Sequence, residues 1–565
     1  MDVFLEKPWL QHYPTEIPYE IDYEEKTLHE CLTSTATLYG EKKALNFLGK
    51  TMSFHELFEE SVQFANFLIS KGLKKGDRVS IYLPNCPQGI ISYYGTLYAG
   101  GVVVQTNPLY TERELSYQLQ DSGSTFIIGL DLLKERIENI RKETPLKHVI
   151  ITSIGDYLPF PKNMLYPFVQ KKEYGKSFKF TPTETTHSFK ESIKNQTVAR
   201  PTVITKSDEL ALLQYTGGTT GFPKGVMLTH KNLVSNTMAS QKWFYKCNPG
   251  EEKIFGVVPF FHVYGMTTVM NLGILCAYEM ILQPKFIVED VLKGIEKHKA
   301  TLFPGAPTMY IALINHPDIL DYDLTSIKAC VSGSAPLPLE VQETFERVTH
   351  GKLIEGYGLS ETSPVACTNF IWDKRKNGSI GVPWPDTMMK VISLENGEPC
   401  DYNIIGEIII KGPQVMMGYW NRKEDTEEAL KNGYLYTGDL GYMDEEGFFY
   451  IVDRKKDMII AGGFNIYPRE IEEVLYENEK ILEVVVAGVP DPYRGETVKA
   501  YVVLKEGVTC TEKELDEYSR KYLAAYKIPR IYEFRTELPK TAIGKILRRS
   551  LIDEEKRKLE NTQLS

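Results

Sequence analysis

The chain has 565 residues, with 65 Lys and Arg against 75 Asp and Glu, which gives a formal net charge of −10. At roughly 150 residues per domain, this length suggests about four folding units with ample material for buried cores. An apolar content of 42% and a charged content of 25% exclude disordered, collagen-like and multi-spanning membrane chains, and the acidic balance disfavours general binding to nucleic acid or anionic lipid.

Cysteine spacing and apolar runs indicate the cellular compartment of the protein. The eight Cys include no C-x-x-C pair, so we expect reduced, buried thiols rather than disulfides or structural zinc. The first residues, MDVFLEKPWLQHYP, carry acidic groups and do not resemble a secretory signal. The longest charge-free stretch, 254–278, is broken by Pro259, His262 and Asn271, so we interpret it as buried core. Together these features predict a cytoplasmic protein.

Strand-like runs alternate with helical ones along the first part of the chain. The order strand, helix, strand, helix, strand is expected over 79–84, 88–101, 102–107, 111–123 and 126–130. Such alternation is typical of parallel sheets with helices on both faces. A polar stretch from about 170 to 208 predicts an exposed connector.

The later part of the chain changes character twice. Short strands with Gly turns dominate 391–452, which indicates a small antiparallel β unit. Beyond Asp453, two strands and two helices indicate a compact α+β domain, with the helices at 469–478 and 511–523. The last residues, 553–565, are expected to be a charged tail.

The segment 215–230, YTGGTTGFPKGVMLTH, has the composition of a phosphate-binding loop. Four Gly, three Thr and Lys224 lie between a predicted strand and a helix that Thr229 would cap. Gly allows backbone N–H groups to face a ligand, while Thr and Lys add donors and charge. It is not a Walker loop, because Gly225 follows the Lys.

Three further segments carry groups that suit a nucleotide. The small residues of 330–338, CVSGSAPLP, form a flat surface for a base. In EGYGLSETSP, 355–364, Glu361 would be repelled by a nearby phosphate unless a cation such as Mg²⁺ lay between them. Asp439, in YTGDLG, offers a carboxylate that accepts two hydrogen bonds from a ribose diol. Each of these segments is also common as a simple turn.

Two segments near the C-terminal region and one histidine complete the candidates. Residues 453–472 carry alternating charges and paired Gly where the composition changes, which indicates a hinge. LPKTAIGKILRR, 538–549, is a basic cluster in an acidic protein. His262 stands alone among aromatic residues, and spacing alone favours a core histidine. No G-x-S-x-G, H-E-x-x-H or G-x-G-x-x-G motif is present.

These motifs together resemble a known family. YTGGTTGFPKG, YGLSETSP, YTGD, DRKKDMIIAGG and PKTAIGK occur in the order shown by the adenylate-forming enzymes, which include acyl-CoA synthetases, non-ribosomal adenylation domains and luciferases. The resemblance covers nearly the whole chain. Residues 106–123 and 488–503 are most similar to bacterial long-chain fatty-acid–CoA ligases.

The resemblance implies ATP-dependent activation of a long-chain fatty acid to acyl-adenylate, followed by thioester formation with CoA. The reaction would require ATP, Mg²⁺ and CoA and would involve no nucleic acid. Alternatives are a medium-chain or aryl carboxylate–CoA ligase and an enzyme that loads a carrier protein. The retained ionic residues disfavour a non-enzymatic binding protein. The oligomeric state stays open, with a homodimer among the alternatives, and peripheral contact with the inner face of the membrane is compatible with a fatty-acid substrate.

The resemblance also implies roles for individual residues. Lys545, Lys224, Glu361 and Ser360 would act in catalysis, with Glu361 and Thr216 at the metal and Lys456 as the hinge. Phosphate contacts would come from Thr216, Gly217, Gly218, Thr219, Thr220, Gly221 and Lys224. The adenosine would lie against Gly333, Ser334, Ala335, Pro336, Tyr357 and Gly358, with its ribose on Asp439 and Arg454. Gly462 and Gly463 would face CoA. The acyl site would include Phe260, His262, Val263, Met266, Phe303 and Gly305.

The expected fold class is α/β with a large N-terminal domain and a smaller, mobile α+β C-terminal domain. The boundaries are 1–453 and 454–565, and the first part divides into α/β subdomains at about 1–200 and 201–390 and a small β-barrel-like unit at 391–453. Two residues depart from the family pattern. Gly217 stands where many relatives have Ser, and Ser334 stands where Gly or Ala is commoner.

Overall fold

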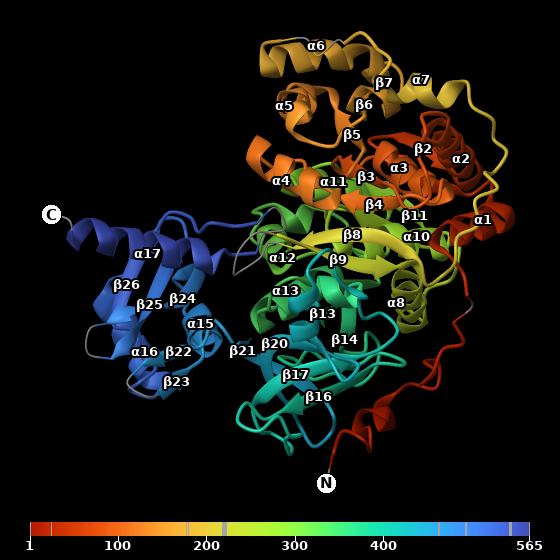
Figure 1. Cartoon of the computed structure of the whole chain (residues 1–565). Helices are drawn as coiled ribbons and strands as arrows, with labels where there is room; N and C mark the ends of the chain where they lie inside the picture. Colours follow the sequence, from red (N-terminus) through yellow and green to blue (C-terminus); the bar gives the residue numbers. More distant parts are fainter. Residues whose placement is uncertain are drawn as a thin grey trace.

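The computed structural model describes residues 2–23, 25–176, 178, 180–216, 223–461, 464–491, 494–541 and 545–563. A large body contains the elements up to β21, and a smaller C-terminal unit lies beside it (Figure 1). This mixed α/β architecture confirms the predicted fold class.

An eight-stranded sheet forms one side of the body, in the order β18-β9-β8-β4-β3-β5-β6-β7. From β8 to β7 all neighbours are parallel, whereas β9 and β18 are antiparallel additions. Its strands are β3 (Arg78–Tyr82), β4 (Val102–Gln105), β5 (Phe126–Leu130), β6 (His148–Thr152), β7 (Thr186–Ser188), β8 (Leu210–Thr216), β9 (Lys224–Thr229) and β18 (Gly418–Tyr419). Helices of this region are α2 (Phe54–Ser70), α3 (Pro87–Tyr98), α4 (Glu112–Ser122), α5 (Lys134–Ile140), α6 (Lys162–Tyr174) and α7 (Phe189–Lys194), with η2 (Asp131–Leu133), η3 (Arg141–Glu143) and η4 (Ile154–Tyr157).

Two four-stranded sheets complete the α/β part, in the orders β10-β11-β1-β2 and β12-β13-β14-β15, and bridges through Leu302 link them. Their strands are β1 (Lys43–Phe47), β2 (Lys50–Ser53), β10 (Lys253–Gly256), β11 (Glu279–Leu282), β12 (Ala329–Ser332), β13 (Lys352–Gly358), β14 (Val365–Thr368) and β15 (Val382–Pro383). The helices are η1 (Pro8–His12), α1 (Leu28–Tyr39), α8 (His230–Trp243), α9 (Val263–Gly265), η5 (Met266–Asn271), α10 (Leu272–Leu275), α11 (Val288–His298), α12 (Pro307–Ile314), η6 (Ile319–Asp321), α13 (Leu339–Thr349) and η7 (Ser360–Thr362).

Strands from before and after residue 200 share these sheets. β1 pairs in parallel with β11, and β4 pairs in parallel with β8. The two expected α/β subdomains are therefore interleaved in sequence. Short-range patterns cannot show this, because parallel pairing joins strands that are far apart in the chain.

A five-stranded antiparallel sheet follows the α/β part, close to the predicted small β unit. It consists of β16 (Met388–Ile392), β17 (Gly406–Lys411), β19 (Leu430–Lys431), β20 (Tyr434–Met443) and β21 (Phe449–Arg454), and α14 (Lys423–Ala429) precedes β19.

The C-terminal unit has its own sheet and its own core. Its elements are β22 (Ile459–Ala461), β23 (Phe464–Ile466), α15 (Pro468–Tyr476), β24 (Ile481–Asp491), β25 (Gly495–Leu504), α16 (Glu512–Tyr522), β26 (Ile531–Arg535) and α17 (Arg548–Gln563). Its buried apolar clusters, which begin at Ile459, contain no described residue of the body. A separate core is what an independently moving domain requires.

The structure corrects two predictions of local structure. The expected connector at 170–208 contains the end of α6, the edge strand β7 and helix α7. The expected charged tail continues α17 as far as Gln563. In both places tertiary pairing or helix propensity outweighs the polar composition.

Burial agrees with the other predictions. Residues 254–278 form β10, α9, η5 and α10 and are mostly buried, as the prediction of core required. Seven of the eight free cysteines are buried, and Cys510 is half-buried. In the part of the chain that the structure describes, no helix is long and apolar enough to cross a membrane.

Candidate functional site

Lys224 and Thr216 face each other at the end of the β8–β9 pair where the chain passes from one strand to the next. Thr216 ends β8, Lys224 begins β9, and the two residues are paired in register. Thr229 caps α8 as predicted, because its hydroxyl accepts the N–H of Asn232 at 3.0 Å. The sequence did not indicate β9 itself. The residues predicted between the two strands, Gly217, Gly218, Thr219, Thr220 and Gly221, lie outside the described residues.

The Lys224 ammonium lies between an aromatic ring and a carboxylate. Its Nζ is 5.3 Å from the centre of the Tyr419 ring and forms an ion pair with Asp425 of α14. The Tyr419 hydroxyl donates to Glu361 Oε1 at 2.8 Å. Tyr419 therefore contacts both the predicted phosphate lysine, through its ring, and the predicted metal carboxylate, through its hydroxyl. No sequence signal identified Tyr419 or Asp425, because only the tertiary fold brings them here.

Ser360 and Glu361 lie on η7, directly after a tight turn. A Cβ on Gly358 would lie 1.8 Å from the carbonyl oxygen of Pro364, so only Gly fits there. The backbone oxygen of Glu361 accepts the N–H of Met416 at 2.9 Å, which ties this turn to the segment before β18. The turn therefore holds both functional side chains in one fixed orientation.

Tyr357, Asp439 and Arg454 form a hydrogen-bonded triad in which Asp439 is buried and the other two are half-buried. The Tyr357 hydroxyl donates to Asp439 Oδ2 at 2.7 Å, and Arg454 Nε contacts Asp439 Oδ1 at 3.0 Å. Asp439 is 3% exposed and pairs with Arg454 across β20 and β21. Burial and then the charge of Asp439 raise the pKa of Tyr357 well above its usual value, so the phenol stays protonated. A carboxylate has about four lone-pair directions, so Asp439 retains acceptor capacity for a ligand.

The predicted adenine surface follows β12. Gly333 is buried against Tyr264, whose ring a Cβ on Gly333 would approach to 3.2 Å. Ser334 has a φ of 75°, in the left-handed region that favours Gly. The sequence showed that Ser334 departs from the family pattern, and the structure shows that the departure falls on a strained backbone position. Ala335 is half-buried and Pro336 is exposed.

The predicted acyl residues are packed within the body. Phe260, Val263, Met266, Phe303 and Gly305 are buried. Val263 begins α9, and Met266 begins η5, which is a π-helix, a form that is frequent at functional sites.

His262 is the one half-buried member of the predicted acyl set, and its Nδ1 accepts the N–H of Tyr264 at 3.3 Å. Burial, and then the positive charge of Lys545, lowers the pKa of His262 to about 4. The imidazole is therefore neutral at pH 7. Lys545 of the C-terminal unit therefore acts electrostatically on the predicted acyl-site histidine, which sequence spacing could not show.

Lys545 enters the same site from the C-terminal unit. Its backbone carbonyl accepts the N–H of Thr541 at 2.8 Å, and its own N–H donates to the Thr541 hydroxyl at 3.1 Å. Surrounding protein, and then the charge of Arg454, lowers the pKa of Lys545 to about 8, against the opposing effect of Asp439. The residue as a whole is nevertheless exposed.

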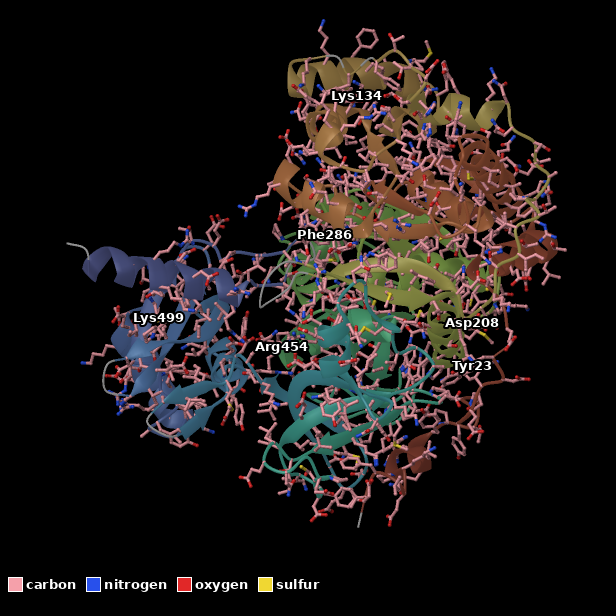
Figure 2. The ribbon with its side chains drawn as sticks, viewed as in Figure 1. Tyr23, Lys134, Asp208, Phe286, Arg454 and Lys499 are labelled. Carbon is pink, nitrogen blue, oxygen red and sulfur yellow. The ribbon has the colours of Figure 1, made fainter. Side chains whose placement is uncertain are left out.

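Lys456, the predicted hinge residue, follows β21 and is exposed. Burial of its ammonium, and then Arg454, lowers its pKa, and Lys224 contributes in the same direction. Figure 2 shows Arg454 at the junction between the body and the C-terminal unit. Gly462 and Gly463, the predicted CoA-facing residues, lie outside the described residues.

Arg548 anchors the segment that carries Lys545. It donates to Asp457 at 2.8 Å and to Glu472 at 2.7 Å, and it lies 3.6 Å from Asp453. These carboxylates raise the pKa of Arg548 above its usual value. Burial raises the pKa of Asp453 to about 6 in spite of Arg548. Asp453 and Asp457 lie on either side of Lys456, so Arg548 links the segment of Lys545 to the predicted hinge.

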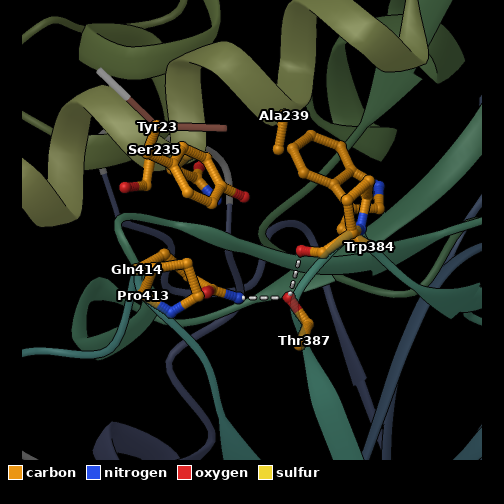
Figure 3. Close-up of a pocket in the computed structure, with 9 residues that line it drawn as sticks. Tyr23, Ser235, Ala239, Trp384, Thr387, Pro413 and Gln414 are labelled. Atoms are coloured by element: carbon orange, nitrogen blue, oxygen red, sulfur yellow. Dashed lines mark hydrogen bonds between the residues drawn. The ribbon is translucent and has the colours of Figure 1, made fainter. Parts of the chain in front are cut away.

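The described cations and carboxylates therefore converge from both parts of the molecule. Arg454 lowers the pKa of both Lys456 and Lys545, and Asp439 and Asp457 oppose it in both cases. Repulsion among these cations makes an anionic ligand favourable at this position. A pocket elsewhere in the body, between α8 and the start of β16, is lined by Tyr23, Ser235, Trp384 and Gln414 and by none of the predicted site residues (Figure 3).

Comparisons with known proteins agree with this geometry. Residues 32–420 match the model of the AMP-binding enzymes, and residues 470–545 match that of the AMP-binding enzyme C-terminal domain. The chain belongs to the AMP-binding enzyme family. This confirms the resemblance predicted from the motifs.

Within this family, the chain is 57% identical to a long-chain-fatty-acid–CoA ligase of Bacillus subtilis, over 97% of this chain and 98% of the relative. Among solved structures, ATP-bound MatB from Rhodopseudomonas palustris is 29% identical, with a TM-score of 0.83 over 94% of this chain and 99% of that one. The anthranilate–CoA ligase AuaEII in complex with anthranoyl-AMP is 26% identical, with a TM-score of 0.85 over 95% and 98%. Members of the family that act as CoA ligases use ATP and CoA.

Proposed function

We propose that this protein is an ATP-dependent long-chain fatty-acid–CoA ligase. The observation that carries the proposal is the position of Lys545, which acts electrostatically on acyl-site His262 and on the Asp439–Arg454 pair at once. One cation thus acts on a residue predicted for the acyl group and on residues predicted for the nucleotide. The identity of 57% to a relative named as a long-chain-fatty-acid–CoA ligase supports the substrate class.

In the first step, a carboxylate oxygen of the fatty acid attacks the α-phosphorus of ATP, and the bond to the β-phosphate oxygen breaks to release pyrophosphate. The transition state spreads negative charge over phosphoryl oxygens, so fixed cations and N–H donors lower its energy. We assign this role to Lys545, Lys224 and Ser360. Neutral His262 would contact the acyl group without competing for negative charge.

Tyr357 and the segment Gly333–Pro336 would hold the adenine, and Asp439 with Arg454 would bind the ribose. The triad fits this task, because Tyr357 and Arg454 fix the Asp439 carboxylate in one orientation. Phe260, Val263, Met266, Phe303 and Gly305 would form the acyl wall.

In the second step, the CoA thiolate attacks the acyl carbon and AMP leaves. Rotation about Lys456 would withdraw Lys545 and present another face of the C-terminal domain, 454–565. Gly462 and Gly463 are assigned to that face from the sequence. The separate cores of the two parts support such a movement.

Glu361 and Thr216 fit a Mg²⁺ site. Mg²⁺ usually binds one or two carboxylates together with substrate phosphates and keeps several waters, so a lone Glu beside a phosphate loop is a suitable donor set. Bound there, Mg²⁺ would neutralise phosphate charge. Tyr419 would hold the Glu361 carboxylate in place through its hydrogen bond.

The test is pyrophosphate exchange and thioester formation with purified protein. Palmitate-dependent exchange of pyrophosphate into ATP, followed by CoA-dependent formation of palmitoyl-CoA, is the expected result. Preference for medium-chain or aromatic acids would correct the substrate class. Exchange without thioester formation would favour carrier-protein loading, and no exchange with any carboxylate in a panel would refute the enzyme assignment.

A further inference from the structure

Helix α6 presents an apolar face to solvent. Four of its outward side chains, and Phe160 two residues before the helix, are more than half exposed, although all are large and apolar: Phe160 (78%), Met164 (63%), Leu165 (56%), Phe168 (72%) and Val169 (54%). Spacings of three and four residues link the four helical members along one face. A contiguous exposed apolar patch of this kind marks an interaction surface.

The inward face of α6 shows that residues other than the exposed apolar ones pack the helix against the body. Tyr166 packs on Gly155 of η4, and Gln170 is 5% exposed and donates to Asp131 at 3.1 Å. The helix therefore buries a polar amide and exposes its apolar residues, which is the reverse of the usual pattern for a surface helix.

Lysines are interspersed with this apolar face. Residues 160–176 contain four Lys and one Glu, in a chain whose net charge is −10. Lys162, Lys171 and Lys172 are exposed, and Lys172 follows Phe168 by one helical turn, so it shares the apolar face. Within the described residues, neither Lys171 nor Lys172 has a carboxylate within salt-bridge distance.

This combination indicates which partner fits. Lysine is depleted from the cores of protein–protein interfaces, because its ammonium is costly to desolvate. At a lipid surface, the same side chain places its stem beside acyl chains and its ammonium at a headgroup phosphate. The alternation of Phe, Leu, Met and Val with Lys therefore matches an anionic bilayer better than a second protein surface.

The position of α6 in the fold is compatible with this partner. In Figure 1 it forms the outer edge of the body, beyond α5, on a different side from the C-terminal unit. A membrane that contacts α6 would leave the C-terminal unit free to move.

We propose that α6, with Phe160, docks this protein on bilayers that contain anionic lipids. The apolar side chains enter the boundary between headgroups and acyl chains, and Lys162, Lys171 and Lys172 contact the headgroup phosphates. The proposal does not depend on the ligase reaction, because docking requires neither ATP nor CoA.

The test is co-sedimentation of the full chain with vesicles made from equal parts of phosphatidylcholine and phosphatidylglycerol, compared with phosphatidylcholine alone. We expect binding to the anionic vesicles that weakens with salt. The double variant Leu165→Ser, Phe168→Ser should bind at least about tenfold more weakly, since each residue loses its apolar insertion. Leu320→Ser is the matched control, because Leu320 is 81% exposed elsewhere on the body, and it should bind as the wild type does.

The lysines are tested separately with Lys171→Glu, Lys172→Glu, which should remove the preference for anionic vesicles. Failure of the wild type to bind, equal binding to both vesicle types, or unchanged binding of the Ser variant would overturn the proposal. A change of oligomeric state in the Ser variant, measured by analytical ultracentrifugation, would instead identify α6 as a contact between copies of the chain. All variants should unfold at the wild-type temperature and retain palmitate-dependent pyrophosphate exchange in detergent, so failure of the ligase proposal would be seen independently.

Discussion

The body and the C-terminal unit contribute to the site in different ways. In the body, Asp439 is 3% exposed, and Tyr357 and Arg454 hold it from two sides. The C-terminal unit contributes Lys545 on a short segment beside the hinge, and its apolar core is its own. The two parts meet through polar contacts, such as that of Asp453 with the N–H of Arg469 at 2.8 Å.

The comparison teaches how one site can serve two half-reactions. Under the proposed function, a fixed surface in the body would retain the nucleotide, while a group carried by a separate core could be exchanged. Polar contacts between the parts suit exchange, because water can replace them when the interface opens, whereas a large apolar interface would resist opening. The following predictions test this division of labour, from the largest expected effect to the smallest.

Replacement of Lys545 by Ala should distinguish the roles of the body and the C-terminal unit most clearly. We expect adenylation to fall by about 10²- to 10³-fold, the typical loss for one group that stabilises charge in the transition state. Conversion of supplied palmitoyl-AMP to palmitoyl-CoA should be nearly unaffected. Pyrophosphate exchange and single-turnover thioester formation measure the two steps, and an equal loss of both would contradict the assigned role.

Replacement of Arg548 by Ala should release the segment that carries Lys545. It leaves Asp453, Asp457 and Glu472 without their shared cation, and breaking such a buried network costs about 3 kcal/mol. All five Trp lie in the body, so Trp fluorescence does not report on the C-terminal unit. Hydrogen exchange of β24 and β25 is therefore the suitable measurement for that unit. Arg549→Ala is the control, since Arg549 is 49% exposed, and it should leave exchange unchanged.

The pKa of Lys545 predicts a pH limit for adenylation. In the free enzyme this pKa is about 8, so the cation is present below pH 8 and is lost as the pH rises through that value. We expect kcat/KM for ATP to fall about tenfold per pH unit above 8. Lys545→Arg should remove this fall, because guanidinium remains charged throughout the range. A fall that persists in the Arg variant would assign the titration to another group.

If Lys224 binds phosphate as proposed, its ion pair with Asp425 would compete with the nucleotide. Both side chains are about 30% exposed, so solvent screening makes the ion pair worth less than about 1 kcal/mol. Asp425→Asn should therefore lower KM for ATP by about two- to fivefold. Glu427→Gln on the same helix is the control, because Glu427 is 67% exposed and pairs with Lys423. A higher KM in the Asn variant would show that Asp425 positions Lys224 for the phosphates.

Ser334→Gly should have the smallest effect. Its φ of 75° disfavours Ser, so Gly should raise the free energy of unfolding of the body by about 0.5 kcal/mol after its own entropic cost is deducted. Urea unfolding followed by Trp fluorescence measures this. Hydrogen exchange in the C-terminal unit should not change, and a decrease in stability would show that the Ser hydroxyl has a partner role.

Particular residues show which features of the site could be predicted from the sequence and which could not. Lys224, Glu361 and Asp439 were predicted from local motifs, because each lies in a short segment whose composition indicates phosphate, Mg²⁺ or diol binding. Arg454 was predicted only through the family resemblance. Tyr419 and Asp425 were not identified, since each gains its role only by contact with a residue at least 58 positions away. Helix α6 was also missed. Its exposed apolar residues look like core in the sequence, and only the packing of Tyr166 and Gln170 shows which face is outside.

The sequence alone determined the α/β class, the family and the chemistry, because these depend on residue types and spacings within short segments. The net charge of −10 did not show that Lys224, Arg454, Lys456 and Lys545 contribute to one site. Tertiary structure decided that convergence, the interleaving of the two halves of the body and the lysine-bearing apolar face of α6. The physical reason is common to all three: charge repulsion, parallel strand pairing and burial are set by neighbours in space, which local sequence does not specify.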